Sequence, residues 1–167
     1  MQASRATAAG QDGEDLEGVV DVVLGASRAL VAVAARSIAE VDETVTLPQF
    51  RTLVALAARG PQNVGLLAAE LGVHSSTMTR MCDRLARRGL IERLPSTESR
   101  REVVVSLSGA GVRLMHAVTA ARRRSIAQIV ANISPDSRRA MVDALQAFSD
   151  AAGEVTDQAW AIGWGRG

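Results

Sequence analysis

The first long stretch of the chain carries apolar side chains at helical spacing. They recur along one stripe, at Leu16, Val20, Val23, Leu30, Ala34, Ile38 and Val41. Three more valines widen this stripe beyond the face that an ordinary surface helix buries, at Val19, Val22 and Val33. The pattern therefore predicts a long helix that is buried on more than one side.

A second, shorter helix is predicted to begin near Leu47, because Pro48 suits a first helical turn. Proline has no backbone N–H, and an N–H in the first turn would have no partner within the helix. Its apolar positions lie on one face, at Phe50, Leu53, Val54 and Ala57. The dipeptide at Gly60 and Pro61 is expected to end this helix.

Two further helices follow, with a glycine between them. Asn63 can cap a helix over Val64–Leu71, and Gly72 permits the sharp turn that leads to a helix over Ser75–Arg88. Gly89 is expected to end that helix. Beyond it, Leu90–Leu94 and Glu102–Leu107 are predicted to pair as a β-hairpin, or wing, with the polar segment between them at its tip.

The rest of the chain is predicted to be helical. Ser108 can cap a long helix that runs towards Ile133, with apolar residues at Leu114, Val118, Ile126, Ile129 and Val130. Ser134, Pro135 and Asp136 open a last helix, whose apolar face is formed by Met141, Leu145, Phe148 and Ala152. The glycine-rich tail after Glu154 contains Trp160 and Trp164, and is either a frayed end or a segment that docks on a partner subunit.

Basic residues concentrate in the middle of the chain, although the formal net charge of the whole is only +1. Residues 1–46 contain three Arg and eight acids, for a net charge of −5. Residues 47–107 contain nine Arg and five acids, for a net charge of +4, and residues 108–167 contain seven Arg and five acids, for +2. Residues 47–107, which contain the closely spaced helices, therefore carry the net positive charge that binding to nucleic acid requires.

The stretch from Leu66 to Met81 meets the packing demands of a helix-turn-helix. Ala68 is small where the two helices must cross, and Gly72 occupies the turn. On a helical wheel, one side of Ser75–Arg88 is apolar and comprises Met78, Met81, Cys82 and Leu85. The opposite side is polar and basic, and is either a DNA-contacting surface or a solvated helix face.

Candidate DNA contacts follow from the chemistry of that polar side. Small hydroxyls near the start of the helix permit close approach to base edges, and Arg80 has the planar fork that reads guanine or holds the backbone. Arg84, Arg87 and Arg88 are suited to phosphates. The candidate residues are Ser75, Ser76, Thr77, Thr79, Arg80, Arg84 and Arg87, together with Arg51 on the preceding helix and Arg100 and Arg101 in the hairpin tip.

Residues from about Leu47 to Gly111 resemble the MarR family of multiple-antibiotic-resistance regulators. The resemblance is carried by Leu47–Arg51, Leu67–Val73, Ser76–Arg80, Asp83–Arg93 and Leu107–Gly111. It implies a homodimer in which the first helix and the last two helices of each chain interlock, while each recognition helix enters a major groove. It also implies a repressor released by a small ligand, often phenolic or lipophilic, that binds between the dimer and DNA-binding regions.

The resemblance further implies that Arg101 enters the minor groove, with Arg100 beside it. The family commonly has an aspartate two residues before this arginine, whereas this chain has Ser99, so a contact that orients Arg101 is expected to be absent. The alternative is a hairpin-tip arginine that stays in solvent.

The fold class expected is mainly α (α+β), with a winged helix-turn-helix domain and flanking helices that form a dimerisation region. The expected units are a disordered tail at 1–13, a dimerisation helix at 14–46, the DNA-binding domain at 47–107, dimerisation helices at 108–153 and a C-terminal tail at 154–167. The absence of a basic-then-apolar start and of eighteen consecutive apolar residues indicates neither a signal peptide nor a membrane span, so a cytoplasmic location is expected.

Other chemistry is weakly supported by the sequence. Cys82 lies on the apolar side of its helix, which favours a buried core residue over a redox sensor. His74, Ser75 and Asp83 lack the arrangement of a hydrolase, with Asp83 expected to pair with Arg87 one turn on. The run at 122–124 is either a second nucleic-acid contact or, more in keeping with a long helix, a solvated face or a partner for the acidic first helix.

Three functions remain at this point. The favoured one is a ligand-responsive repressor that binds double-stranded DNA as a homodimer, with no cofactor, no metal and no membrane partner. The second is an architectural or low-specificity DNA-binding protein without a ligand switch, and the third is an enzyme or ligand-storage protein on a degraded regulator fold. The ligand-binding residues are not identified; an aromatic content of 2% and the absence of Tyr suggest an aliphatic pocket for an apolar effector.

Overall fold

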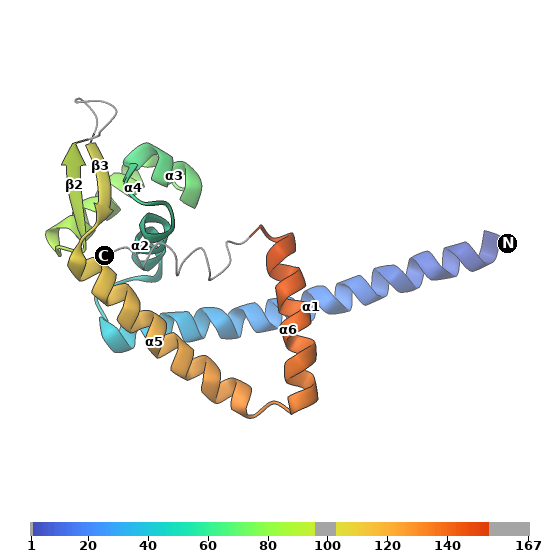
Figure 1. The fold of residues 1–167 in the computed structure, drawn as a ribbon. Helices are drawn as coiled ribbons and strands as arrows, with labels where there is room; N and C mark the ends of the chain where they lie inside the picture. Colours follow the sequence, from blue (N-terminus) through green and yellow to red (C-terminus); the bar gives the residue numbers. More distant parts are fainter. Residues whose placement is uncertain (1, 96–102, 154–167) are drawn as a thin grey trace.

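The computed structural model describes the backbone of residues 2–95 and 103–153, with side chains from Asp15 onward in these ranges. Its elements in chain order are α1 (Gln2–Val41), α2 (Leu47–Arg59), β1 (Gln62–Asn63), α3 (Val64–Leu71), α4 (Ser75–Arg87), β2 (Ile91–Pro95), β3 (Val103–Leu107), α5 (Gly109–Ala131) and α6 (Pro135–Ala151). This is the mainly helical, winged helix-turn-helix fold that the sequence predicts (Figure 1).

Side-chain caps fix the starts of several helices. The Asn63 side chain accepts a hydrogen bond from the Leu66 N–H at 2.8 Å, and the Ser108 hydroxyl accepts from the Gly111 N–H at 3.0 Å. Ser134 caps α6 in the same way. These three caps are as predicted, since a polar side chain at a helix start satisfies N–H groups that have no partner within the helix.

The wing is a three-stranded antiparallel sheet in the order β1-β3-β2. β2 and β3 pair from Ile91 opposite Leu107 to Pro95 opposite Val103, which confirms the predicted hairpin. β1 was not predicted, because two residues are too short to show alternation; it adds Gln62 and Asn63 to the other side of β3.

The core lies where α2, α3, α4 and the sheet meet the C-terminal end of α1 and the N-terminal half of α5. Apolar side chains with no exposed surface in this core include Leu53, Leu67, Met78, Leu85, Val105, Met115 and Val118. The winged unit is therefore continuous with the two long helices that flank it, and its position is fixed relative to them.

The long helices are only partly buried within one chain. α1 projects away from the winged unit towards the N-terminus (Figure 1), and most valines and leucines of its outer part are exposed. No residue of α6 is buried. The burial predicted for more than one side of α1 is thus confined to its C-terminal part, at Val33, Ser37 and Ile38. α1 also begins at Gln2, whereas the sequence predicted a tail over residues 1–13.

Part of α1 is long and apolar enough to cross a membrane by length and composition. This part is Asp15–Val41, and 6% of its apolar window is buried within the chain. Hydropathy along the sequence did not indicate this segment, because charged residues interrupt its apolar run. Length and composition alone do not distinguish a membrane span from a helix buried between protein subunits.

The start of α5 touches the chain segment that follows α4. A Cβ atom at Gly111 would lie 2.1 Å from the carbonyl oxygen of Leu90 and 3.2 Å from the Leu107 side chain. Backbone cannot move aside as a flexible side chain can. Only glycine therefore fits at this contact between α5 and the end of the recognition unit.

We predict that Gly111→Ala lowers the free energy of unfolding by about 1–3 kcal/mol or more, because the new methyl group displaces α5 from Leu90. Urea denaturation of the purified variant measures the change. The matched control is Gly109→Ala in the same helical turn, where the nearest atom to the new Cβ is a guanidinium nitrogen of Arg113 at 3.5 Å. If both variants unfolded at the parent's midpoint, the close contact would be disproved.

Candidate nucleic-acid interface

The turn between α3 and α4 depends on Gly72. This residue has φ of +66° and ψ of +35°, the left-handed conformation in which a side chain is strained. The Val73 N–H donates to the Ala68 carbonyl at 3.0 Å, which closes the end of α3. α4 can then begin at Ser75, three residues after the glycine, as the sequence predicts.

α4 has two distinct faces. Met78, Cys82 and Leu85 have no exposed surface, and Met81 is partly buried beside them. The opposite side, which we call the polar face of α4, consists of Ser75, Ser76, Thr77, Thr79, Arg80, Arg84 and Arg87, all of them exposed. The helical-wheel assignment of buried and exposed sides is thereby confirmed. Contact of the polar face with DNA stays a prediction.

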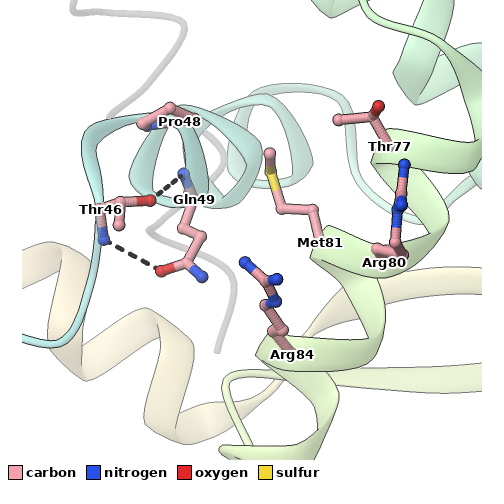
Figure 2. A pocket seen from close by; sticks show the side chains of 7 residues that line it. All are labelled: Thr46, Pro48, Gln49, Thr77, Arg80, Met81 and Arg84. Atoms are coloured by element: carbon pink, nitrogen blue, oxygen red, sulfur yellow. Dashed lines mark hydrogen bonds between the residues drawn. The ribbon is translucent and has the colours of Figure 1, made fainter.

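Two side chains of the polar face also hydrogen-bond along their own helix. The Thr79 hydroxyl donates to the Ser75 carbonyl at 2.8 Å, and the Arg80 Nε donates to the Ser76 carbonyl at 3.3 Å. The second bond uses one of the five N–H groups of Arg80. It holds the side chain near the first turn of α4, beside Thr77 (Figure 2).

A groove of about 360 Å³ separates the polar face from the start of α2. Figure 2 shows Arg80 and Arg84 on the α4 side, with Thr46 and Gln49 opposite and Met81 between them. Thr46 and Gln49 form a capping box, in which the Gln49 N–H donates to Thr46 and the Thr46 N–H donates to Gln49 Oε1 at 3.0 Å. The groove is thus positively charged and opens beside a helix start, where anions are favoured.

The remaining candidates lie elsewhere. Arg51 is exposed on α2 and lines a smaller groove with Thr52, Met78 and Met81. Arg100 and Arg101, and Ser99 before them, fall between residues 96 and 102 and so lie outside the described residues, as do Trp160 and Trp164. Their roles stay predictions.

Asp83 does not pair with Arg87, contrary to the sequence prediction. It forms an ion pair with Arg93 on β2, which packs beside α4. The helical periodicity considered only neighbours on the same helix, whereas β2 brings Arg93 to the half-buried side of α4. Arg87 is exposed on the polar face.

Arg88 also has a partner that local sequence did not indicate. Its guanidinium pairs with Asp42, which directly follows α1. The two side chains are 29% and 26% exposed. Arg88 was expected to hold a phosphate, but here it connects the end of α4 to the end of α1.

The arginines at 122–124 do not form one uniform solvated face. Arg124 pairs with Glu40 of α1 at 2.7 Å, in keeping with the predicted pairing to the first helix. Arg122 is half-buried, with its guanidinium carbon 5.7 Å from the centre of the Phe50 ring, and burial lowers its pKa. The packing of Arg122 on α2 explains why its side chain is less exposed than that of an ordinary surface arginine.

The residues considered for catalysis or metal binding have other contacts or none that an active site needs within the described part of the chain. His74 forms no side-chain cap hydrogen bond at the start of α4, and Asp83 is engaged by Arg93. Within residues 15–95 and 103–153, no three His, Cys, Asp or Glu side chains gather as a metal ion would need.

A family model for the MarR family matches residues 45–103, which run from the residue before the α2 cap into β3. A crystal structure of RV1404 from Mycobacterium tuberculosis is 48% identical in sequence, covers 84% of this chain and 96% of its own, and superposes with a TM-score of 0.79. An uncharacterized HTH-type transcriptional regulator of Mycobacterium bovis, Mb0904, is 33% identical over 64% of this chain and 76% of its own length.

The chain belongs to the MarR family of helix-turn-helix transcriptional regulators. The transcriptional repressor NicR of Pseudomonas putida is also similar, with 28% identity over 65% of this chain and 69% of its own. Crystal structures of lower identity share the fold, among them the apo form of MarR from E. coli with a TM-score of 0.65. The fold and family read from the residues are thus confirmed.

Within this MarR-family fold, Cys82 is a buried core residue. It has no exposed surface, and burial raises the pKa of its thiol, with the nearby Asp83 carboxylate adding to the increase and Arg93 opposing it. Thiol nucleophilicity needs the thiolate, so a buried thiol with a raised pKa reacts slowly.

We predict that Cys82 reacts with a disulfide reagent such as DTNB much more slowly in the folded protein than in denaturant. Thiol labelling followed by absorbance measures both rates. Peroxide treatment should leave DNA binding unchanged. Loss of DNA binding on oxidation of the parent, with resistance in Cys82→Ser, would show instead that this thiol is a sensor.

Proposed function

We propose that this chain is a homodimeric repressor that binds a pseudo-palindromic operator in the cytoplasm and is released by a small apolar or phenolic ligand. The observation that carries the proposal is the division of α4: Met78, Cys82 and Leu85 on its apolar side have no exposed surface, while its polar face is exposed. A surface helix with this composition, next to a wing, is suited to the major groove.

The chemistry of the polar face supports both affinity and sequence discrimination. Its first turn presents only small hydroxyl side chains, which allow the helix start to approach base edges closely. Arg80 follows directly and can donate two hydrogen bonds to one guanine, whereas Arg84 and Arg87 extend towards the phosphates on either side. This order of small, forked and extended residues favours base readout over purely electrostatic binding.

The relatives support DNA binding and repression. NicR is named a repressor, and the solved structures include a mutant of MepR from Staphylococcus aureus bound to an oligodeoxyribonucleotide, which superposes with a TM-score of 0.61. At 20% identity, that complex supports the fold and does not identify bases contacted by this chain. An architectural protein with little sequence preference is the alternative, because the same winged unit would serve it.

A footprint on the DNA flanking the gene, followed by titration of specific and random duplexes, tests the function. We predict protection of an inverted repeat whose half-sites lie about one helical turn apart, with binding that weakens steeply as salt rises. Arg80→Ala should cost about 1–3 kcal/mol on the specific duplex and little on random DNA, because it removes base contacts.

The matched control is Arg139→Ala, which removes an exposed arginine from α6, far along the chain from the polar face. It should bind both duplexes like the parent. Equal affinity of the parent for specific and random duplexes would favour the architectural alternative. No retention of either at moderate salt would contradict DNA binding altogether.

A second copy of the chain is the partner that the exposed apolar helices support best. Large apolar side chains on α1 and α6 are at least half exposed, including Leu16, Val19, Val22, Leu30, Val142, Leu145 and Phe148. Isolated chains rarely leave so many large apolar residues in water, and such surfaces mark interfaces. Burial of α1 and α6 against their counterparts would also set two polar faces at a fixed separation, as an inverted repeat requires.

We predict that the parent has twice the chain mass in light scattering and that Leu145→Asp shifts it to the monomer. Operator binding should then weaken about a hundredfold or more, since one subunit can no longer hold the other on the DNA. Asp143→Asn changes one charge on the side of α6 opposite Leu145, at an exposed residue, and should stay dimeric. A parent that is monomeric, or that sediments with membranes through α1, would contradict the proposal.

A further inference from the structure

The end of α4 meets the ends of two dimerisation helices at one corner of the winged unit. The Leu90 carbonyl accepts a hydrogen bond from the Ser108 N–H at 3.2 Å and lies against Gly111 in the first turn of α5. On the other side, Arg88 pairs with Asp42 at the end of α1. The orientation of α4 relative to the dimerisation helices is therefore fixed from two sides.

Asp42 is itself held firmly. Its Oδ1 accepts hydrogen bonds from the Thr44 hydroxyl at 2.7 Å and the Thr44 N–H at 3.0 Å, while its Oδ2 accepts from Arg88. Its own N–H donates to the Ile38 carbonyl at 2.8 Å. The pKa of Asp42 lies below its usual value, chiefly because the Thr44 hydroxyl donates to it, with Arg88 adding to an effect that partial burial opposes. Asp42 is thus ionised at neutral pH and cannot turn freely towards another partner.

Arg88 differs from the arginines of the polar face in both position and contact. It occupies the C-terminal cap of α4, and its N–H bonds back to the last turn. Its guanidinium is directed to α1, whereas Arg80 and Arg84 line the groove beside the polar face. A residue that is engaged in this way is suited to orient α4, and less suited to hold a phosphate.

We propose that the Asp42–Arg88 ion pair is a positioning contact, which fixes the angle between α4 and α1 and thereby sets the half-site spacing that the dimer accepts. This inference rests on the proposed function, since it concerns how the two subunits of a dimer bind one operator. Neither residue touches DNA in this account. They act through the orientation of the polar face.

Three variants test the pair. Asp42→Asn keeps an oxygen acceptor for Thr44 but removes the charge that holds Arg88, Arg88→Met keeps the apolar part of the side chain, and the third variant combines both changes. Each single change should weaken binding to the best operator by about three- to tenfold, and the double variant should be no weaker than either, because both changes remove one interaction. Arg88→Lys, which keeps a charge, should retain most of the affinity.

The preference for half-site spacing is the measurement that general destabilisation would not change. It is obtained from a series of operators whose half-sites are moved apart or together by one or two base pairs. The parent should prefer one spacing sharply, and Asp42→Asn should bind the series with flatter preference. Binding to random duplex and its salt dependence should match the parent, because no phosphate contact is lost. The control pair is Glu40→Gln and Arg124→Met, which removes an exposed ion pair between α1 and α5 and should leave the spacing preference unchanged.

A direct phosphate contact by Arg88 would give a different set of results. If Arg88 held a phosphate directly, Arg88→Met would weaken specific and random duplexes alike and lower the salt slope by about one per subunit. Asp42→Asn would then leave binding unchanged or strengthen it. That outcome, or an unchanged spacing preference in folded, dimeric Asp42→Asn, would overturn the inference. Failure of the parent to select an operator at all would instead refute the proposed function.

Discussion

The burial of one side of α4 is the constraint on which the rest of the structure depends. Met78, Cys82 and Leu85 are removed completely from water by α2, α3 and the sheet, so the helix cannot rotate about its axis without exposing them. The left-handed turn at Gly72 fixes where the helix begins, and the Gly111 contact and the Asp42–Arg88 pair fix where it ends. The direction of the polar face is a consequence of these apolar and backbone contacts.

The long helices, in contrast, leave much of their apolar surface uncovered within one chain. α1 and α6 carry stripes of large apolar residues that the winged unit does not cover, and α5 packs on α1 only over part of its length. The hydrophobic effect favours covering these stripes, and in the proposed homodimer a second copy of the chain would cover them. A protein that reads an inverted repeat needs such a symmetric arrangement, so the exposed apolar surface and the exposed polar surface point to one assembly.

Local sequence predicted the features that arise from local interactions. The caps at Asn63, Ser108 and Ser134, the turn at Gly72 and the two sides of α4 depend on residues a few positions apart, and periodicity or residue chemistry indicates them directly. The ion pairs of Asp83 with Arg93 and of Asp42 with Arg88 join residues on different elements, so no spacing rule could find them before the elements were placed. β1 was not predicted because two residues are too few to show alternation of polar and apolar positions. The Gly111 contact was not predicted because a close approach between two backbone segments does not change the hydropathy pattern.

The most direct test of the account is a crystal structure of the chain bound to a duplex selected from the DNA that flanks its gene. We expect two copies related by a twofold axis, with the first turn of each α4 against base edges in successive major grooves and Arg84 near phosphates. A complex in which α4 turns its Ser75 to Arg87 side away from the duplex, or in which a single copy binds through another surface, would contradict it.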